Sequence, residues 1–436
     1  MTKRYHKNTP FSSLKRRKIE VNFEGGDVTS NGGVLLLREI DKKLRLTEAV
    51  NKAIKDNRHP SYCKHDQLSL LRQRIFGLAL GYEDLNDHTE LRHDGAMQTA
   101  SGQLAALGSA STLCRLEQRA DKPAAIELHQ VLADQFIASF KTPPKRLTLD
   151  FDATHDFVYG EQEKRHFNAF YDDYCFLPLY VFGGSQLLAC YLRPSSRGAA
   201  HHAAAVLKLL VKRLREAWPN VDILFRGDSG FCKPLILNWC DRNGVDYVVG
   251  IGKNSVLTRK SEIIRASAES IFRIENKAQK RYTEFQYQAN SWPSERRVVV
   301  KAEYNERGEN TRYVVTSLTQ SPQHIYAHIY CSRGDMENRI KEQKSLFSDR
   351  TSCHLWWPNQ LRVLLSGFAY VLMNALRRIA LADTELANCQ VDTLRVKLLK
   401  IGGIIIRNTR RIKIMLSSAY PHQTIFSAAA SAINSS

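Results

Sequence analysis

Four side chains in the stretch 330–344 have the types and the spacing that metal and phosphate chemistry requires. Tyr330, Arg333, Glu337 and Lys344 follow one another at intervals of three, four and seven residues. At roughly 100° per residue, a helix returns these positions to within about 60° of one another, so they share one face. A carboxylate there would bind a hard metal ion, and the cations would bind phosphate oxygens. The alternative is a solvated helix on which Arg333 and Glu337 form an ordinary i,i+4 ion pair.

Two further acidic positions lie in segments that are typical of β-strands. Residues 146–154 alternate apolar and polar side chains, which predicts a strand with Asp150 and Asp152 on the same face. Residues 221–230 are an apolar strand pattern that places Asp228 just past the strand end, where α/β sheets hold their ligands. The alternative for Asp228 is an N-cap, because a helix pattern follows it.

These residues resemble the catalytic signature of insertion-sequence DDE transposases. Asp152-Ala153-Thr154 resembles the Asp-x-Thr of their first catalytic strand, Asp228 resembles their second aspartate, and Tyr330-x2-Arg333-x3-Glu337-x6-Lys344 is similar to the signature around their glutamate. Four longer stretches resemble the thirteen-eighty family of these enzymes, namely Asn22 to Gly26, Gly160 to Glu163, Tyr171 to Leu179 and Arg226 to Phe231. The resemblance covers about residues 20–415. Asp150 stays an alternative to Asp152, which we prefer because the family pattern has a threonine two places later.

The resemblance implies a fold, an activity and partners. The fold would be α/β, with an RNase H-like mixed-sheet core, a β-rich insertion and a helical N-terminal DNA-binding domain. The activity would be cut-and-paste DNA transposition, in which the protein binds terminal inverted repeats and catalyses metal-dependent strand cleavage and strand transfer to target DNA. Asp152, Asp228 and Glu337 would hold two Mg²⁺ or Mn²⁺ ions for phosphodiester hydrolysis and transesterification. A homodimer would hold two transposon ends in the synaptic complex.

Two other functions fit the same residues. An RNase H-fold nuclease or resolvase would share the carboxylates without needing to recognise end sequences. A catalytically inactive DNA-binding protein descended from a transposase would not need them, and the presence of all three acids favours the enzyme.

The elements around the two aspartates follow the order that an RNase H-like core requires. In chain order we expect strands at 146–154, 176–182 and 187–191, a helix at 199–218, the strand before Asp228, a helix at 231–243 and a strand at 245–251. Glu337 comes 109 residues after Asp228, further than one strand and one helix need, so we expect residues 253–322 to be a β-rich insertion.

The whole chain is expected to divide into six segments. They are a flexible basic arm (1–22), a helical DNA-binding and dimerisation domain (23–143), the first part of the core (144–252), the insertion (253–322), the second part of the core (323–383) and a basic C-terminal segment (384–436). Residues 67–91 are similar to a helix-turn-helix around Gly81, although ordinary helix packing gives the same pattern. The last residues, 427–436, are expected to be frayed.

Composition points to a nucleic-acid partner and away from membranes. Sixty-three Lys and Arg against 44 Asp and Glu give a formal net charge of +19. The most apolar long helix pattern, at about 361–381, is interrupted by arginines, which argues against a membrane span. The nine cysteines have no C-x2-C pairing, which favours reduced thiols in a cytoplasm. The resemblance to insertion-sequence transposases implies a bacterial cytoplasm and association with the nucleoid.

Several other side chains are candidates for DNA contact. On the signature helix these are Tyr330, Arg333 and Lys344, with Lys341 beside them. Arg16, Arg17 and Lys18 in the N-terminal arm and Arg410 and Arg411 in a predicted C-terminal strand pair would bind phosphates. Trp292 is a candidate for stacking on an unpaired base, and the alternative is a tryptophan that caps a small β core.

Overall fold

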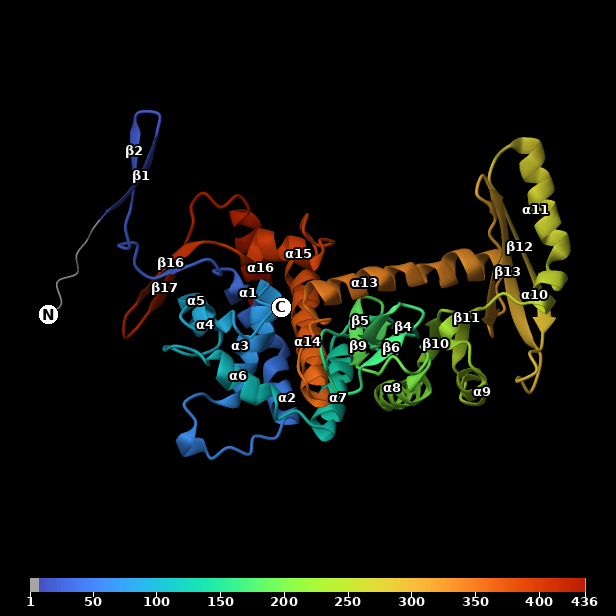
Figure 1. Cartoon of the computed structure of the whole chain (residues 1–436), viewed down its shortest axis with the longest axis horizontal. Coiled ribbons are helices and arrows are strands. Elements are labelled where there is room, and N and C mark those ends of the chain that lie inside the picture. The colour runs from blue at the N-terminus through green and yellow to red at the C-terminus, as the bar shows by residue number, and fades with distance from the viewer. Residues whose placement is uncertain (1–7, 436) are drawn as a thin grey trace. The chain divides into compact units, whose positions relative to one another are not determined.

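The computed structural model describes residues 8–435 and divides into two compact units (Figure 1). Unit 1 combines the described residues up to Asn51, Asp56–Leu116 and the residues from Leu372 onward. Unit 2 consists of Lys52–Lys55 and Glu117–Val371. The expected helical domain 23–143 is therefore split, because its last helix, α7 (Lys122–Ala138), belongs to unit 2.

Unit 2 is built on one large mixed sheet. Within the described residues this sheet has nine strands in the order β12-β13-β15-β11-β10-β4-β8-β9, with β14 paired to β13. The neighbours β4, β10 and β11 are parallel, and the flanking pairs β4/β8 and β11/β15 are antiparallel. The strands are β4 (Arg146–Ala153), β8 (Leu179–Gly183), β9 (Gln186–Tyr191), β10 (Asp222–Gly227), β11 (Asp246–Ile251), β12 (Gln279–Tyr287), β13 (Arg296–Asn305), β14 (Gly308–Glu309) and β15 (Arg312–Thr316).

The strands of residues 253–322, the expected β-rich insertion, join the large sheet. Their strand β15 pairs with β11, so β12, β13 and β15 extend the same sheet. Two helices that the sequence patterns did not predict, α10 (Ser255–Lys260) and α11 (Glu262–Glu275), precede these strands, and α11 packs on β12 and β13. Alternation of apolar residues predicted the strands, but periodicity within one strand carries no information about its partner.

The two faces of the central strands carry different helices. Phe151 and Phe225 belong to the cluster formed with α8 (Ala203–Ala217) and α9 (Pro234–Arg242). On the opposite face Leu224 packs with the apolar side chains of the helical segment that follows β15. Figure 1 shows α8 and α9 on one side of these strands and α13 on the other.

That helical segment changes its geometry at the signature residues. It passes from α12 (Pro322–His324) through a π-helical turn (Ile325–Tyr330) and a 3-10 turn (Cys331–Arg333) into α13 (Gly334–Ser345). The regular helix expected from Tyr330 is therefore regular only in α13. Local π-helical geometry inside a helix is frequent at functional sites.

A small three-stranded sheet follows β4 directly along the chain. It has the order β5-β7-β6, with β5 (Asp156–Phe157), β6 (His166–Asn168) and β7 (Asp173–Phe176). The stretch from Ala153 to β5 is short, so this sheet starts next to the strand that carries Asp152.

Unit 1 joins helices from the N-terminal part of the chain to C-terminal elements. Strand β16 pairs with both β3 and β17, and α16 packs on α1. The expected frayed end at 427–436 is wrong for residues 427–435, which lie in α16 with Ala429 and Ile433 buried; Ser436 lies outside the described residues. The elements are β3 (Val28–Thr29), α1 (Val34–Leu44), α2 (Leu46–Ala53), α3 (Gln67–Leu80), α4 (His88–Leu91), α5 (Gly95–Ala100), α6 (Ala110–Glu117), α15 (Val391–Leu394), β16 (Gly403–Arg407), β17 (Ile412–Leu416) and α16 (Gln423–Ser435).

The helix-turn-helix pattern at 67–91 gives one long helix and one short one. Helix α3 ends at Gly81, which has a left-handed backbone (φ 92°) and receives the side chain of Arg395 where a Cβ would stand. Helix α4 has only four residues, too few to lie along a DNA groove as a recognition helix does.

Most of the N-terminal arm that the structure describes is a β-hairpin. Strands β1 (Thr9–Leu14) and β2 (Arg17–Val21) pair antiparallel, and all their residues are exposed. The further arm cations Lys3, Arg4 and Lys7 lie outside the described residues.

One helix in the described part of the chain, α14 (Trp356–Ala380), is long and apolar enough to cross a membrane by length and composition. Its apolar window has a mean hydropathy of 1.3, and 83% of that window is buried inside the protein. Burial of this kind is what the core helix of a globular protein shows.

Candidate active site

Asp152 and Asp228 lie at neighbouring positions at the carboxyl ends of two parallel strands. The register of β4 and β10 pairs Asp150 with Arg226; Asp152 follows two residues after Asp150 within β4, and Asp228 follows two residues after Arg226, directly past the end of β10. Because side chains alternate along a strand, both aspartates project from the face that carries the signature segment. The sheet therefore brings together two acids that are 76 residues apart in the chain.

The environment of Asp152 is that of a carboxylate close to a second one. Burial raises the pKa of Asp152 to about 6, with the Arg333 guanidinium lowering it and the Asp228 carboxylate raising it. Arg333 Nη1 donates to Asp152 Oδ2 at 2.9 Å, while Asp228 Oδ1 accepts from the Gly230 amide at 2.9 Å. One guanidinium thus offsets part of the charge of two adjacent acids.

Asp150 is held in a buried ion pair. Arg226 contacts both of its carboxylate oxygens, with Nη2 at 2.7 Å from Oδ2, and also donates to the carbonyl of Ile329. The side chains of Asp150 and Arg226 are only 7% and 10% exposed. A two-point contact of this kind occupies the lone pairs that a metal ion would need. The geometry therefore favours Asp152 over Asp150 as a metal ligand.

Tyr330 reaches the site over a glycine. Its hydroxyl lies 2.6 Å from the point where a Cβ on Gly250 of β11 would stand, and the Ser229 amide nitrogen lies 3.0 Å from that point. Burial raises the pKa of Tyr330, Arg333 lowers it and Asp228 raises it. Tyr330 and Arg333 therefore gather with the two aspartates, and a side chain at position 250 would block that approach.

Glu337 does not join this group in the structure. It is exposed in the first turn of α13, one turn beyond Arg333. Within residues 8–435, no three or more His, Cys, Asp or Glu side chains are arranged to hold a metal ion. Of the expected three carboxylates, the structure brings together two.

Lys344 has partners inside the protein. Its Nζ donates to the carbonyl of His155 at 2.8 Å and lies 3.6 Å from Oδ1 of Asp156, whose side chain is fully buried. In this structure the ammonium of Lys344 therefore fastens the end of α13 to the segment that follows β4, and its phosphate contact stays a prediction.

The other predicted DNA-binding cations are exposed. Lys341 lies on α13, Arg16, Arg17 and Lys18 lie at the tip and second strand of the N-terminal hairpin, and Arg410 and Arg411 lie in the turn between β16 and β17.

Trp292 caps a small core, which was the alternative to base stacking. It is 5% exposed and packs edge-on against Tyr287 at 5.5 Å, with the Arg296 guanidinium 5.4 Å from its ring centre. An unpaired base has no access to a ring buried in this way.

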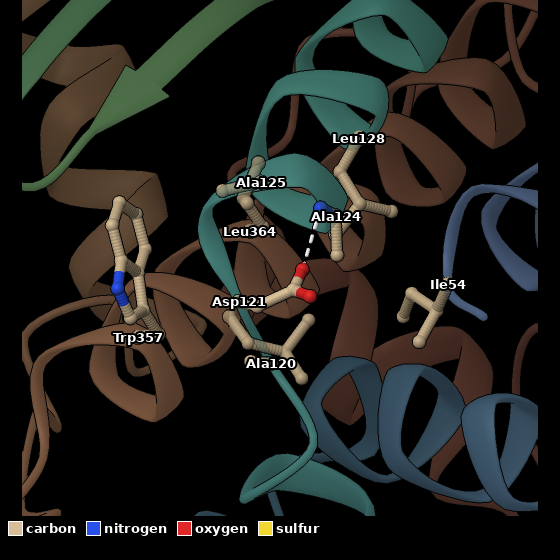
Figure 2. A pocket seen from close by; sticks show the side chains of 9 residues that line it. Ile54, Ala120, Asp121, Ala124, Ala125, Leu128, Trp357 and Leu364 are labelled. Carbon is tan, nitrogen blue, oxygen red and sulfur yellow. Dashed lines mark hydrogen bonds between the residues drawn. The ribbon is translucent and has the colours of Figure 1, made fainter. Parts of the chain in front are cut away.

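A small hollow elsewhere in unit 2 carries no comparable chemistry (Figure 2). Its walls are mostly apolar, and the carboxylate of Asp121 in it accepts a hydrogen bond from the Ala124 amide at 2.8 Å as the N-cap of α7. Its lining residues are Ile54, Ala120, Asp121, Ala124, Ala125, Leu128, Trp357, Leu361 and Leu364.

Comparison with known proteins gives the family. The family described as "Transposase DDE domain group 1" matches residues 11–436, almost the entire chain. The chain belongs to this family. No curated protein matches the sequence. Among solved structures, the chain is similar to piggyBac transposase in a cryo-EM structure of its synaptic complex with hairpin DNA, at a TM-score of 0.42 and 12% identity over 85% of this chain and 80% of that one.

The donor set of this transposase-family chain fits a divalent ion at the paired aspartates. Mg²⁺ and Mn²⁺ prefer carboxylate oxygens, and two adjacent acids that are partly buried gain most from a doubly charged ion. Asp152 and Asp228 meet both conditions, whereas within residues 8–435 Glu337 does not complete a three-residue metal site with them in this structure.

Sequence reasoning assigned no role to two members of the site, Arg226 and Gly250. A signal for Arg226 was available, because it precedes Asp228 by two residues as Asp150 precedes Asp152. If the two aspartates lie side by side on parallel strands, their upstream charges must also lie side by side. Gly250 gave no such signal, since its role depends on where Tyr330 arrives.

Proposed function

We propose that this chain is a DNA transposase that binds terminal inverted repeats and catalyses metal-dependent cleavage and strand transfer. The observation that carries the proposal is the pair Asp152 and Asp228 at the ends of parallel strands, with Arg333 and Tyr330 gathered over them. Membership of the transposase DDE family supports the reaction class.

The catalytic core is proposed to be RNase H-like. In chain order its strands are β4, β8, β9, β10 and β11, and in space they run β9-β8-β4-β10-β11. Antiparallel pairing among the first three and parallel pairing of β4, β10 and β11 support this assignment.

Each residue at the site has a proposed role. Asp152 and Asp228 would hold Mg²⁺ or Mn²⁺, and two such ions supply charge neutralisation and an activated attacking oxygen in phosphodiester chemistry. Glu337 is the proposed third carboxylate, because it lies on the same helical segment as Arg333. Arg333 would bind the DNA phosphate near the cut through its planar guanidinium, and Tyr330 would donate a hydrogen bond to the same backbone.

The basic hairpins of unit 1 are proposed to bind DNA away from the cut. Arg16, Arg17 and Lys18 on the β1–β2 hairpin and Arg410 and Arg411 in the turn between β16 and β17 are exposed. Because β3 follows the first hairpin closely and pairs with β16, both hairpins belong to the same part of unit 1. Synapsis of two transposon ends would need at least a homodimer during the reaction.

The test is cleavage of a plasmid that carries the inverted repeats bounding the DNA element that encodes this chain. We expect cutting at the repeats with Mg²⁺ or Mn²⁺ and none with a chelator. Asp152→Asn, Asp228→Asn and Glu337→Gln should each bind the ends but reduce cutting by about a thousandfold or more, as loss of a main electrostatic group does.

A plasmid without the repeats separates the alternatives. Equal metal-dependent cutting of both plasmids would indicate a nuclease that does not recognise ends. Specific binding without cutting under any metal would indicate a DNA-binding protein and would overturn the proposal. Cutting that persists in Glu337→Gln alone would remove only Glu337 from the site.

A further inference from the structure

Aromatic side chains line the start of the small sheet that follows the catalytic strand. His155, three residues after Asp152, stacks on Tyr171 with ring centres 4.5 Å apart and planes at 27°. Tyr171 contacts Phe170 edge-on at 4.9 Å, and His155 contacts Phe157 edge-on at 4.8 Å. We call His155, Phe157, Phe170 and Tyr171 the aromatic ridge.

The ridge is open to solvent at its outer members. Phe170 is 86% exposed and Phe157 is 42% exposed. Single exposed apolar residues are ordinary. Here the ring contacts are continuous and run from His155, three residues after the proposed metal ligand Asp152, to the exposed ring of Phe170. A continuous aromatic surface of this kind is suited to stacking on a planar ligand.

The turn that presents Phe170 is held in place by hydrogen bonds. The Phe170 amide donates to Asn168 Oδ1 at 3.0 Å, and the Tyr171 amide donates to the Asn168 carbonyl at 3.1 Å. Asn168 Nδ2 donates to the Ser195 carbonyl at 3.0 Å, and Asp172 closes the turn with a left-handed backbone (φ 54°). These hydrogen bonds therefore fix the backbone of the turn while the Phe170 side chain stays exposed to solvent.

Two observations identify the ridge as close to the candidate active site. Lys344 Nζ donates to the His155 carbonyl, so the ridge is fastened to the helix that carries Glu337. Burial raises the pKa of Tyr171, and the nearby groups Cys175, Asp152 and Asp228 raise it further.

The chemistry around the ridge favours a nucleobase over a protein side chain. Two cations lie at its inner end: Lys344 Nζ donates to the His155 carbonyl at 2.8 Å, and Arg333 Nη1 donates at 2.9 Å to Asp152, three residues before His155. Aromatic faces interleaved with cations are the combination that binds unpaired nucleotides, because bases stack on the rings while the cations follow the phosphates.

We propose that the aromatic ridge receives an unpaired nucleotide next to the scissile phosphate, with Phe170 entering the base stack to separate it from its neighbour. This inference rests on the proposed function and names a part of the substrate, a nucleotide that has left the duplex. Phe170 is a positioning residue for the cut, and it does not take part in bond making.

The probe is a duplex of the terminal inverted repeat with 2-aminopurine, which brightens when it leaves the stack, at the nucleotide beside the cut. The full-length Asp228→Asn variant, which keeps the duplex uncut, should brighten the probe severalfold. Adding Phe170→Ala should abolish most of that rise, Phe170→Trp should retain it, and the exposed aromatic control Tyr62→Ala, 89% exposed in unit 1, should leave it unchanged.

Cleavage by the protein with an intact Asp228 gives the second readout. Phe170→Ala should cut a fully paired duplex about tenfold or more slowly. It should regain most of the rate on a duplex with a mismatch beside the cut, since that base is already unpaired. A structural defect would slow both duplexes alike.

The outcomes separate this inference from the proposed function. Normal cutting of paired DNA by Phe170→Ala would overturn the ridge proposal and leave the transposase proposal intact. The same holds if the unmodified protein cuts but Asp228→Asn does not brighten the probe. A change in oligomeric state without any change in the DNA signals would assign the ridge to protein contact and would also overturn it. Absence of cutting by the unmodified chain would count against the proposed function itself.

Discussion

At the scale of single residues, the site is organised by pairs of opposite charge on neighbouring elements. Arg226 binds Asp150 and the Ile329 carbonyl, Arg333 binds Asp152, and Lys344 binds the segment after β4. The cations of the signature stretch were predictable as a group. Which acid each would meet was not, because that depends on strand register and on the π-helical turn, which a periodicity argument assuming a regular helix does not include.

Substitution of Asp150 and Asp152 should give opposite phenotypes. Asp150→Asn leaves a buried guanidinium without its counter-charge, which costs about 3–5 kcal/mol of unfolding free energy, yet should retain metal-dependent cutting per folded molecule. Asp152→Asn should cost less stability, because Asp228 stays beside Arg333 as a second counter-charge, and should abolish cutting. Urea unfolding and plasmid cleavage measure the two effects. Loss of cutting in folded Asp150→Asn would return Asp150 to the metal site.

Asp156 should give the stability of the protein a pH dependence. Burial raises its pKa from 3.8 to about 8, with Lys344 lowering it and Asp349 raising it. Between these two values the folded state keeps a proton that the unfolded state has lost, so stability falls as the pH rises, by at most about 1.4 kcal/mol for each pH unit, and levels off above 8.

Asp156→Asn should remove that slope. Relative to the unmodified protein, the variant should gain stability steadily from pH 5 to pH 8. Urea unfolding at several pH values tests this, with exposed Asp222→Asn as a matched control. An unchanged slope in Asp156→Asn would show that Asp156 stays ionised beside Lys344.

At the scale of elements, the sheet was largely predictable and its neighbours were not. Each strand that carries or flanks an aspartate appears at the predicted place, because alternation and apolar runs are local signals. The joining of β12, β13 and β15 to the same sheet was missed, since strand partners depend on tertiary packing. Helices α10 and α11 were missed as well.

The contact between β11 and the signature segment predicts a steric effect at Gly250. In Gly250→Ala the new methyl group would stand 2.6 Å from the Tyr330 hydroxyl and 3.0 Å from the Ser229 nitrogen, so the protein should lose about 1–3 kcal/mol. Adding Tyr330→Phe should restore part of this, because it removes the nearer atom but leaves the backbone contact. Thermal unfolding of the two single variants and the double variant measures the coupling. Additive losses would mean that Tyr330 does not lie over Gly250.

At the scale of the whole molecule, positive charge is in excess and part of it stands on exposed hairpins. The formal net charge is +19, and the proposed DNA contacts at Arg16, Arg17 and Lys18 are all exposed. A polyanionic partner was therefore predictable from composition. The sequence did not predict that the N-terminal and C-terminal parts of the chain form unit 1 together, because the paired strands β3 and β16 are more than 370 residues apart.

Replacing Arg16, Arg17 and Lys18 together by Gln should weaken DNA binding and make it less sensitive to salt. The slope of log affinity against log salt should become shallower by about 0.9 for each lost phosphate contact, so by about 2–3 in total. The matched control replaces three exposed lysines of unit 2, Lys208, Lys212 and Lys277, which removes the same charge. Equal slopes in the two triple variants would mean that the hairpin contributes only through net charge.

The pairing of β3 with β16 and the packing of α1 on α16 have a consequence for biosynthesis. Translation proceeds from the N-terminus, so the first helices of unit 1 leave the ribosome long before the strand and the helix that complete their core. The main part of unit 2, Glu117–Val371, emerges in between. A nascent chain that has reached Val371, or one cut short soon after it by a premature stop codon, therefore has the strands of the large mixed sheet without a finished unit 1.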